Sequence, residues 1–222
     1  LAHVPHGGGK AVIIKPAQLN NRIKLYRAFG RFVEQLGGRY ITAIDSGTTL
    51  ADMDVVCEVT SHATGSNHDG LDPSPVTALG VFSGMLAAAE FKLDLNSLSG
   101  LRVAIQGLGN VGYELAKKLH SSGARLVVTD IDPLKIERCV NEFNATTVSP
   151  EEIFEVPCEI FSPCGLGAVI NDQTIDKLQC QIVAGAANNQ LSEARHGDLL
   201  HQRDILYAPD YVINAGGLIN VS

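Results

Sequence analysis

Three glycines and an aspartate form the clearest chemical pattern in this sequence. Gly107, Gly109 and Gly112 occur in QGLGNVG, between an apolar run and an amphipathic one, and Asp130 lies eighteen residues after Gly112. Such glycines permit a tight turn, close approach of backbone to a pyrophosphate and close helix–strand packing. The aspartate would accept hydrogen bonds from ribose hydroxyls and repel a 2′-phosphate. The pattern predicts an NAD site formed by Gly107, Leu108, Gly109, Asn110, Val111, Gly112 and Asp130.

A lysine directly behind three glycines is the second chemical feature. Lys10 in HGGGKAVII does not belong to a P-loop, because Ala11 replaces the magnesium-binding hydroxyl and Val4 replaces the first glycine. A glycine-flanked lysine can instead approach a substrate in a partly desolvated pocket and exchange protons with it. A surface lysine in a glycine turn is the alternative interpretation of this stretch.

Polar side chains follow three further strand-like runs. Asp45 comes after RYITA and before a glycine and two threonines, a setting for either a plain turn or a carboxylate beside a cleft. Asn189 lies in GAANNQL and Asn214 in YVINAGG. Since ligands of doubly wound sheets bind beyond the carboxyl ends of the strands, we expect both asparagines near the nicotinamide and the substrate.

Composition favours a globular protein that binds small molecules. The 222 residues are 45% hydrophobic and carry a formal net charge of -7, which gives no long-range attraction for nucleic acid or an anionic membrane. We expect neither partner, and no apolar run is expected to reach the roughly 20 residues that span a bilayer. Five cysteines without a C-x-x-C pair favour reduced thiols in the cytoplasm. No metal site is predicted, because further ligands are lacking beside the pairs His3/His6 and His196/His201.

Alternating strands and helices are needed to position these groups. Helix starts are indicated at Thr49, Asp132 and Ser149 by capping residues. Short strands separated by helices predict an α/β fold with a parallel sheet wound on both faces. The turn-rich stretch 65–75 marks a boundary between domains. Strands are predicted at 11–14, 39–43, 102–106, 125–129, 146–148, 159–162, 181–184, 205–207 and 211–213.

Six segments together resemble the glutamate/leucine/phenylalanine/valine dehydrogenase family, and most closely its leucine dehydrogenase branch. The resemblance implies NAD-linked, reversible oxidative deamination of an amino acid to a 2-oxo acid and ammonia. It implies that Lys10 is the catalytic lysine and that Asp45 is the acid/base aspartate. It also implies that Thr77 and Asn189 contact the cofactor and that Ala43, Thr64 and Asn214 contact the substrate. The segments are GGGKAVII, FGRFVEQLGGRYITAIDSGTT, DPSPVTALGVF, QGLGNVG, GAANNQL and YAPDYVINAGGLIN.

The substrate and the domain organisation follow from the same resemblance. Ala43 and Thr64 are uncharged, whereas a glutamate enzyme requires a cation for the distal carboxylate, so we expect a branched-chain substrate such as leucine, valine or isoleucine. A phenylalanine- or tryptophan-type enzyme and a non-catalytic NAD-binding module are the alternatives. We expect a partial substrate domain over 1–70, an NAD-binding Rossmann domain over 71–222, a cytoplasmic location and a homo-oligomer of the full-length protein. An upstream carboxylate-binding lysine and the C-terminal helices of the family are not found in this chain.

Overall fold

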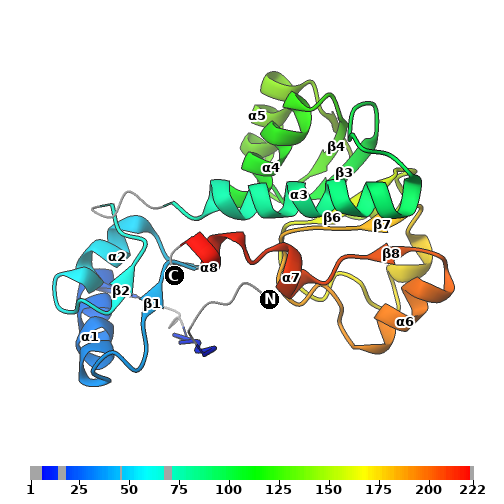
Figure 1. Ribbon diagram of the computed structural model, residues 1–222. Coiled ribbons are helices and arrows are strands. Elements are labelled where there is room, and N and C mark those ends of the chain that lie inside the picture. The colour runs from blue at the N-terminus through cyan, green and yellow to red at the C-terminus, as the bar shows by residue number, and fades with distance from the viewer. Residues whose placement is uncertain (1–6, 15–18, 46, 68–71, 221–222) are drawn as a thin grey trace. The chain divides into compact units, whose positions relative to one another are not determined.

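The chain folds into two compact units, seen in Figure 1. The computed structural model describes residues 7–14, 19–45, 47–67 and 72–220, so His3 and His6 lie outside the described residues. The first unit comprises Leu1–Pro73 with Ile219–Ser222, and the second comprises Ser74–Leu218.

Two helices and a short sheet build the first unit. Helix α1 (Arg22–Gln35) packs against α2 (Leu50–Cys57), and their contact buries Tyr26, Met53 and Val56. Strand β1 (Thr42–Ala43) pairs in parallel with β2 (Ala63–Thr64). The predicted cap of α2 is confirmed, because Thr49 and Asp52 form a complete capping box.

The predicted strand at 11–14 is wrong. These residues are irregular, and the side chains of Val12 and Ile14 are exposed. Among the described residues, the sheet of the first unit contains β1 and β2, so the run finds no strand to pair with. Apolar composition alone indicated a strand here, but a strand forms only where a neighbour satisfies its backbone groups.

A six-stranded parallel sheet forms the centre of the second unit. Its order is β5-β4-β3-β6-β7-β8, which in chain order is the 3-2-1-4-5-6 arrangement of a Rossmann-type fold. The predicted doubly wound α/β fold is therefore confirmed. The order reverses between β3 and β6, and this reversal is where such sheets bind ligands. The strands are β3 (Arg102–Gln106), β4 (Arg125–Thr129), β5 (Thr146–Thr147), β6 (Ile160–Pro163), β7 (Ile182–Val183) and β8 (Leu206–Tyr207).

Helices cover both faces of this sheet. Val103 and Ile105 of β3 join one buried core with α3, α4 and α5, whereas Ala104 joins a second core with η1, η2 and α6. The alternation along β3 is that of a strand buried on both faces. The helices are α3 (Ser74–Leu93), α4 (Asn110–Ser121), α5 (Pro133–Phe143), η1 (Glu152–Glu155), η2 (Ile175–Lys177), α6 (Arg195–Gln202) and α7 (Asp210–Ile213). The short helix α8 (Gly216–Asn220) has its first three residues in this unit.

Helix starts in the second unit are mostly as predicted. Asp132 caps α5, and Ser149 exchanges hydrogen bonds with Glu152 at the start of the 3-10 helix η1. The predicted strand at 211–213 is wrong, because these residues belong to α7. The dipeptide Pro209-Asp210 is a helix-start signal, and it prevails over the β-branched residues that follow.

Helix α3 corrects a third expectation, that no apolar run is long enough to span a bilayer. It is long and apolar enough, by length and composition, to cross a membrane. The apolar residues of α3 form part of the core. Ala78, Val81 and Met85 are fully buried where α3 packs against α4. Figure 1 shows α3 running beside the sheet of the second unit.

The cysteines are free thiols, as expected. Burial raises the pKa of Cys158 and of Cys180 to about 12, so both remain protonated and unreactive at neutral pH.

Candidate functional site

The glycine-rich loop after β3 is shaped by backbone contacts. Gly107 has φ +97°, and a Cβ there would lie 2.6 Å from the amide nitrogen of Gly165. A Cβ on Gly112 would lie 2.1 Å from the carbonyl oxygen of Gly107. Gly109 differs, because a Cβ there would meet nothing within 4 Å. Two glycines are thus required by packing, and the third faces open space that a phosphate could enter.

Helix α4 begins at this loop. Its N-cap is Gly109, which has no side-chain oxygen for the first amides of the helix. An anion placed there would receive hydrogen bonds from these amides and be stabilised by the helix dipole. A hollow of about 170 Å³ adjoins the loop, and its lining includes two cations. This chemistry fits the pyrophosphate of a dinucleotide. The lining residues are Leu108, Gly109, Asn110, Tyr113, Lys135 and Arg138.

Asp130 is held against the same loop. Its side chain is 8% exposed, and its Oδ2 accepts a hydrogen bond from the amide of Leu108 at 2.6 Å. Oδ1 accepts one from the amide of Asp132 at 2.9 Å, and Nζ of Lys135 lies 3.9 Å away. The structure therefore brings Asp130 to the glycines, where a ribose would lie beside a bound pyrophosphate.

Two loops at the carboxyl edge of the sheet are joined through Asn189. Its carbonyl accepts a hydrogen bond of 2.6 Å from the amide of Ala168. Asn189 and Ala168 have φ values of +50° and +59°, a left-handed conformation that costs free energy for residues other than glycine. The loops after β6 and β7 thus have a defined conformation, and Asn189 lies at their junction.

Asn214 reaches the loop that carries Asn189. Its Nδ2 donates hydrogen bonds to Asn188 Oδ1 at 2.6 Å and to the carbonyl of Ala186 at 3.2 Å. The contact is therefore with Asn188, which the sequence analysis missed. Asn188 and Asn189 are adjacent and of the same type, so the sequence does not indicate which of them contacts Asn214. Only the fold decides this.

Thr77 lies in the first turn of α3, beside the start of α8. A Cβ on Gly216 would lie 2.6 Å from the carbonyl oxygen of Val76 and 3.4 Å from Cα of Thr77. Gly216 is two residues beyond Asn214, so Thr77 and Asn214 lie on neighbouring segments of the second unit.

Gln190 is a positioning residue that the sequence analysis also missed. It is completely buried, and its Nε2 donates to the carbonyl oxygens of Gly185 at 2.8 Å and Ala187 at 3.0 Å. Its own amide donates to Asp210 Oδ2 at 3.0 Å. One side chain thereby fixes the loop after β7 and links it to the start of α7.

In the first unit, Lys10 and Asp45 form an ion pair in direct contact. The sequence separates these residues widely, and the fold brings them together. The side chains are 64% and 44% exposed, respectively. The partly desolvated setting expected around Lys10 is therefore not formed by this unit.

The turn that carries Asp45 is fixed from two sides. Thr48 Oγ1 donates to the carbonyl oxygen of Asp45 at 2.6 Å and accepts from its amide at 2.8 Å. Nη2 of Arg22 donates to the carbonyl of Gly47 at 2.7 Å. A hydroxyl three residues after an aspartate is a known turn signal that could have identified Thr48. Arg22 lies at the start of α1, and no sequence pattern near Asp45 indicates that it contacts this turn.

Arg22 also pairs with the capping carboxylate of α2. Its Nε and Nη2 donate to Oδ1 and Oδ2 of Asp52, each at 2.7 Å. The guanidinium of Arg22, followed in importance by the hydrogen bonds from Thr49, holds the pKa of Asp52 below its ordinary value. The starts of both helices are thus tied to the turn that presents Asp45.

Ala43 and Thr64 lie directly opposite each other in the parallel pair of β1 and β2. Asp45 follows β1 by two residues. The structure therefore gathers three predicted site residues at one end of this small sheet.

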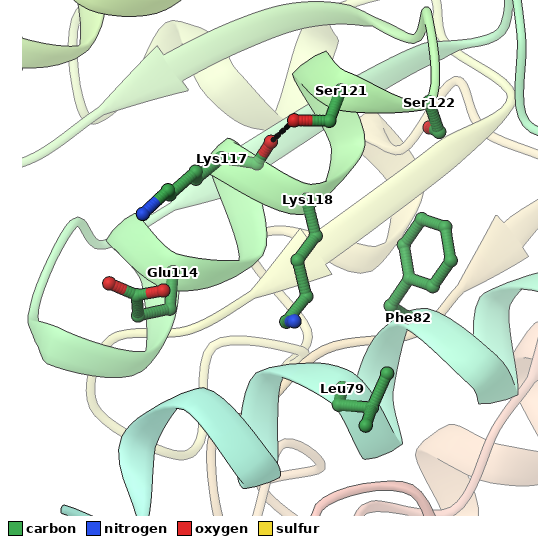
Figure 2. A pocket seen from close by; sticks show the side chains of 7 residues that line it. All are labelled: Leu79, Phe82, Glu114, Lys117, Lys118, Ser121 and Ser122. Atoms are coloured by element: carbon green, nitrogen blue, oxygen red, sulfur yellow. Dashed lines mark hydrogen bonds between the residues drawn. The ribbon is translucent and has the colours of Figure 1, made fainter.

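A larger hollow lies between α3 and α4, shown in Figure 2. It has a volume of about 510 Å³, and the side chain of Lys118 extends across it toward α3. Ser121 Oγ donates to the carbonyl of Lys117 at 2.9 Å along α4. The glycine loop is not part of its lining, so size alone does not identify the candidate site. The lining residues are Leu79, Phe82, Glu114, Lys117, Lys118, Ser121 and Ser122.

Comparison with known proteins gives a consistent family. The profile of the Glutamate/Leucine/Phenylalanine/Valine dehydrogenase family matches residues 71–133 and 132–222. The profile of the Glu/Leu/Phe/Val dehydrogenase dimerisation domain matches residues 1–62. The chain therefore belongs to the glutamate/leucine/phenylalanine/valine dehydrogenase family.

Individual relatives include enzymes for different amino acids. A leucine dehydrogenase from Thermoactinomyces intermedius is 53% identical over 97% of this chain and 60% of its own length. An L-tryptophan dehydrogenase from Nostoc punctiforme is 49% identical over 99% of this chain and 62% of its own length. A crystal structure of L-tryptophan dehydrogenase from Nostoc punctiforme superposes with a TM-score of 0.79 at 47% identity, covering 99% of this chain and 63% of that one. The chain thus spans less than two thirds of the relatives it matches.

Proposed function

We propose that the whole protein catalyses NAD-dependent, reversible oxidative deamination of an apolar, branched-chain L-amino acid to its 2-oxo acid and ammonia. The contact of Lys10 with Asp45 carries this proposal, because it places a proton-exchanging amine beside a carboxylate in a chain that also has a dinucleotide-type glycine loop. The 53% identity to a leucine dehydrogenase supports the choice of reaction.

NAD fits the residues of the second unit. The open space at Gly109 and the first amides of α4 would hold its pyrophosphate, and Asp130 would hold the adenosine ribose. The loops at Asn189 and Asn214 would orient the nicotinamide end. Bound NAD would accept the hydride that leaves Cα of the amino acid.

Lys10 and Asp45 would divide the proton transfers. Asp45 would take a proton from the substrate ammonium and return one to the departing ammonia. Lys10 would accept a proton from the water that attacks the imine carbon and would stabilise the oxygen that becomes the carbonyl. The sum is amino acid, water and NAD⁺ giving 2-oxo acid, ammonium, NADH and one proton. Their direct contact allows a proton to pass between them.

The substrate class is proposed from Ala43 and Thr64. They are neighbours in the register of the parallel strands β1 and β2 and carry no charge, so this end of the sheet suits an apolar side chain and offers no partner for a second carboxylate. The 49% identity to an L-tryptophan dehydrogenase favours an aromatic substrate as the second candidate.

A substrate panel tests the proposal. Formation of reduced nicotinamide by the whole protein would be followed with leucine, valine, isoleucine, phenylalanine, tryptophan and glutamate. We expect the highest kcat/KM with a branched-chain substrate. Preference for an aromatic substrate would select the second candidate, and preference for glutamate would refute the apolar class. Calorimetric binding of NAD without turnover of any substrate would indicate a non-catalytic binding module.

Assembly and location are part of the same proposal. The match of residues 1–62 to a profile described as a dimerisation domain supports a homo-oligomer, and free thiols suit the reducing cytoplasm. Size-exclusion chromatography with light scattering would contradict the first point by showing a monomer of the whole protein.

A further inference from the structure

The charges around the glycine loop are arranged unevenly. Asp130 is buried, and both of its oxygens already accept backbone amides. The accessible charges on the adjoining hollow are instead the cations Lys135 and Arg138, whose side chains are 45% and 57% exposed. A ligand entering this hollow would therefore meet positive charge before it met Asp130.

Arg138 is held by two groups on α4 and α5. Its guanidinium carbon lies 3.6 Å from the centre of the Tyr113 ring, a cation–π contact. Its Nε donates to Oε1 of Glu142 at 3.0 Å, and the hydroxyl of Tyr113 donates to Oε2 of the same carboxylate at 2.5 Å. The hydrogen bond from Tyr113, followed by that from Arg138, holds the pKa of Glu142 below its ordinary value. Glu142 is thus ionised at neutral pH, and its carboxylate accepts the hydrogen bond from Nε of Arg138.

We propose that Glu142, by occupying Arg138, makes this site discriminate against dinucleotides that carry a 2′-phosphate. The inference rests on the proposed NAD site and adds a specificity-determining residue to it. Glu142 acts as a positioning residue, since it lines no part of the hollow and works through Arg138.

The physical basis is competition for one guanidinium. A phosphate monoester carries a charge of about -1.5 to -2 at neutral pH, and arginine binds it through paired hydrogen bonds. Asp130 is the residue that would bind the ribose hydroxyls of a dinucleotide, and Nζ of Lys135 is 3.9 Å from that carboxylate. Lys135 therefore offsets part of the repulsion from Asp130. The other cation of the hollow, Arg138, donates a hydrogen bond from its Nε to Glu142, and this carboxylate offsets part of the attraction of the guanidinium for a 2′-phosphate.

Removal of the Glu142 charge should leave the guanidinium of Arg138, which already lines the hollow, available to a 2′-phosphate. Calorimetric titration of the whole protein with NAD and with NADP, without any substrate, measures the ratio of the two affinities. We expect Glu142→Gln to shift this ratio by about tenfold toward NADP, the gain of one charge-assisted contact. In the double variant with Arg138→Gln the shift should disappear.

Glu137→Gln is the matched control, because it removes the same charge from an exposed position of the same helix. We expect it to leave the NADP-to-NAD ratio unchanged. Glu142→Ala is a second variant that removes the carboxylate bound to Arg138. Thermal denaturation of each variant verifies its folding.

Distinct outcomes separate this inference from the proposed function. An unchanged ratio in both Glu142 variants, an equal shift in Glu137→Gln or a shift that survives loss of Arg138 would overturn the role of Glu142. Absence of NAD binding by the unsubstituted protein would refute the NAD site itself, and with it the proposed function.

Discussion

The two units carry their candidate chemistry in different ways. In the second unit, the candidate cofactor site is made of backbone and buried groups: Gly112 packs against the loop, and Asp130 accepts two amides. In the first unit, Lys10 and Asp45 are exposed side chains that extend from irregular segments. Substitutions at packed positions such as Gly112 should therefore affect folding and function together, whereas substitutions at the open position Gly109 and at the exposed pair of the first unit should affect function alone.

The largest effect is expected at Lys10. Lys10→Ala should lower kcat by about 10² to 10⁴, the range of a proton-transferring group. The thermal midpoint should not move, because the side chain is exposed. Initial rates with leucine and NAD, together with thermal denaturation, measure both quantities. Lys24→Ala, at an exposed position of α1, is the control. An equal loss of activity in this variant would contradict a specific catalytic role for Lys10.

Gly112→Ala should destabilise the protein by about 3 kcal/mol, the cost of an added methyl group that backbone obstructs. The clash is with the carbonyl oxygen of Gly107, which no side-chain rotation can relieve. The urea midpoint measures the loss. Gly109→Ala adds the same methyl group in open space and should change stability by less than about 0.5 kcal/mol. Equal midpoints for the two variants would show that the loop is not fixed as described.

Asp52→Asn should lower the stability of the first unit by about 2 kcal/mol at neutral pH, because it breaks a capping box and a paired contact with Arg22. The folded pKa of Asp52 lies below its ordinary value, so its contribution is complete above about pH 4 and is lost as pH falls through the folded pKa.

Hydrogen exchange of the α2 amides, followed between about pH 7 and pH 3, measures this contribution. The Asp52→Asn variant should lack the part of the acid destabilisation that Asp52 causes in the unsubstituted protein. Glu58→Gln is the contrast, because it removes the exposed ion pair with Arg27 and should have a smaller effect. Identical pH profiles for Asp52→Asn and the unsubstituted protein would contradict the role of Asp52.

Gln190→Met should have the smallest effect, a loss of about 1 to 2 kcal/mol in stability from two missing hydrogen bonds. Because the loop after β7 would be less ordered, KM for NAD should rise with little change in kcat. Gln173→Met, at an exposed position of the same unit, is the control. Equal KM values for the two variants would argue against a positioning role for Gln190.

The difference between the two units also explains which features the sequence predicts well. Local signals in the second unit, such as the spacing of Gly107, Gly109 and Gly112 and the cap at Asp132, predict the Rossmann-type fold and its loop. Glycine spacing and capping are physical requirements within a few residues of chain, so sequence reports them directly.

Long-range contacts are where the sequence analysis fails. Arg22 reaches the turn after Asp45 from another helix, and Gln190 is identified as a positioning residue only by the carbonyls it meets in the fold. The apolar composition of the exposed run 11–14 predicts a strand, but pairing depends on a neighbouring strand that composition does not reveal. The ion pair of Lys10 and Asp45 is apparent only from the fold, because the residues alone leave a surface lysine and a plain turn open as alternatives.

The most direct test of this division is calorimetric titration of NAD into three forms of the whole protein: unsubstituted, Gly109→Ala and Lys10→Ala. If the glycine loop binds the cofactor and the lysine performs proton transfer, Gly109→Ala should weaken NAD binding by at least about tenfold with unchanged stability, the loss of a close phosphate contact. Lys10→Ala should bind NAD as the unsubstituted protein does. Unchanged affinity in Gly109→Ala, or a comparable loss in Lys10→Ala, would contradict the account.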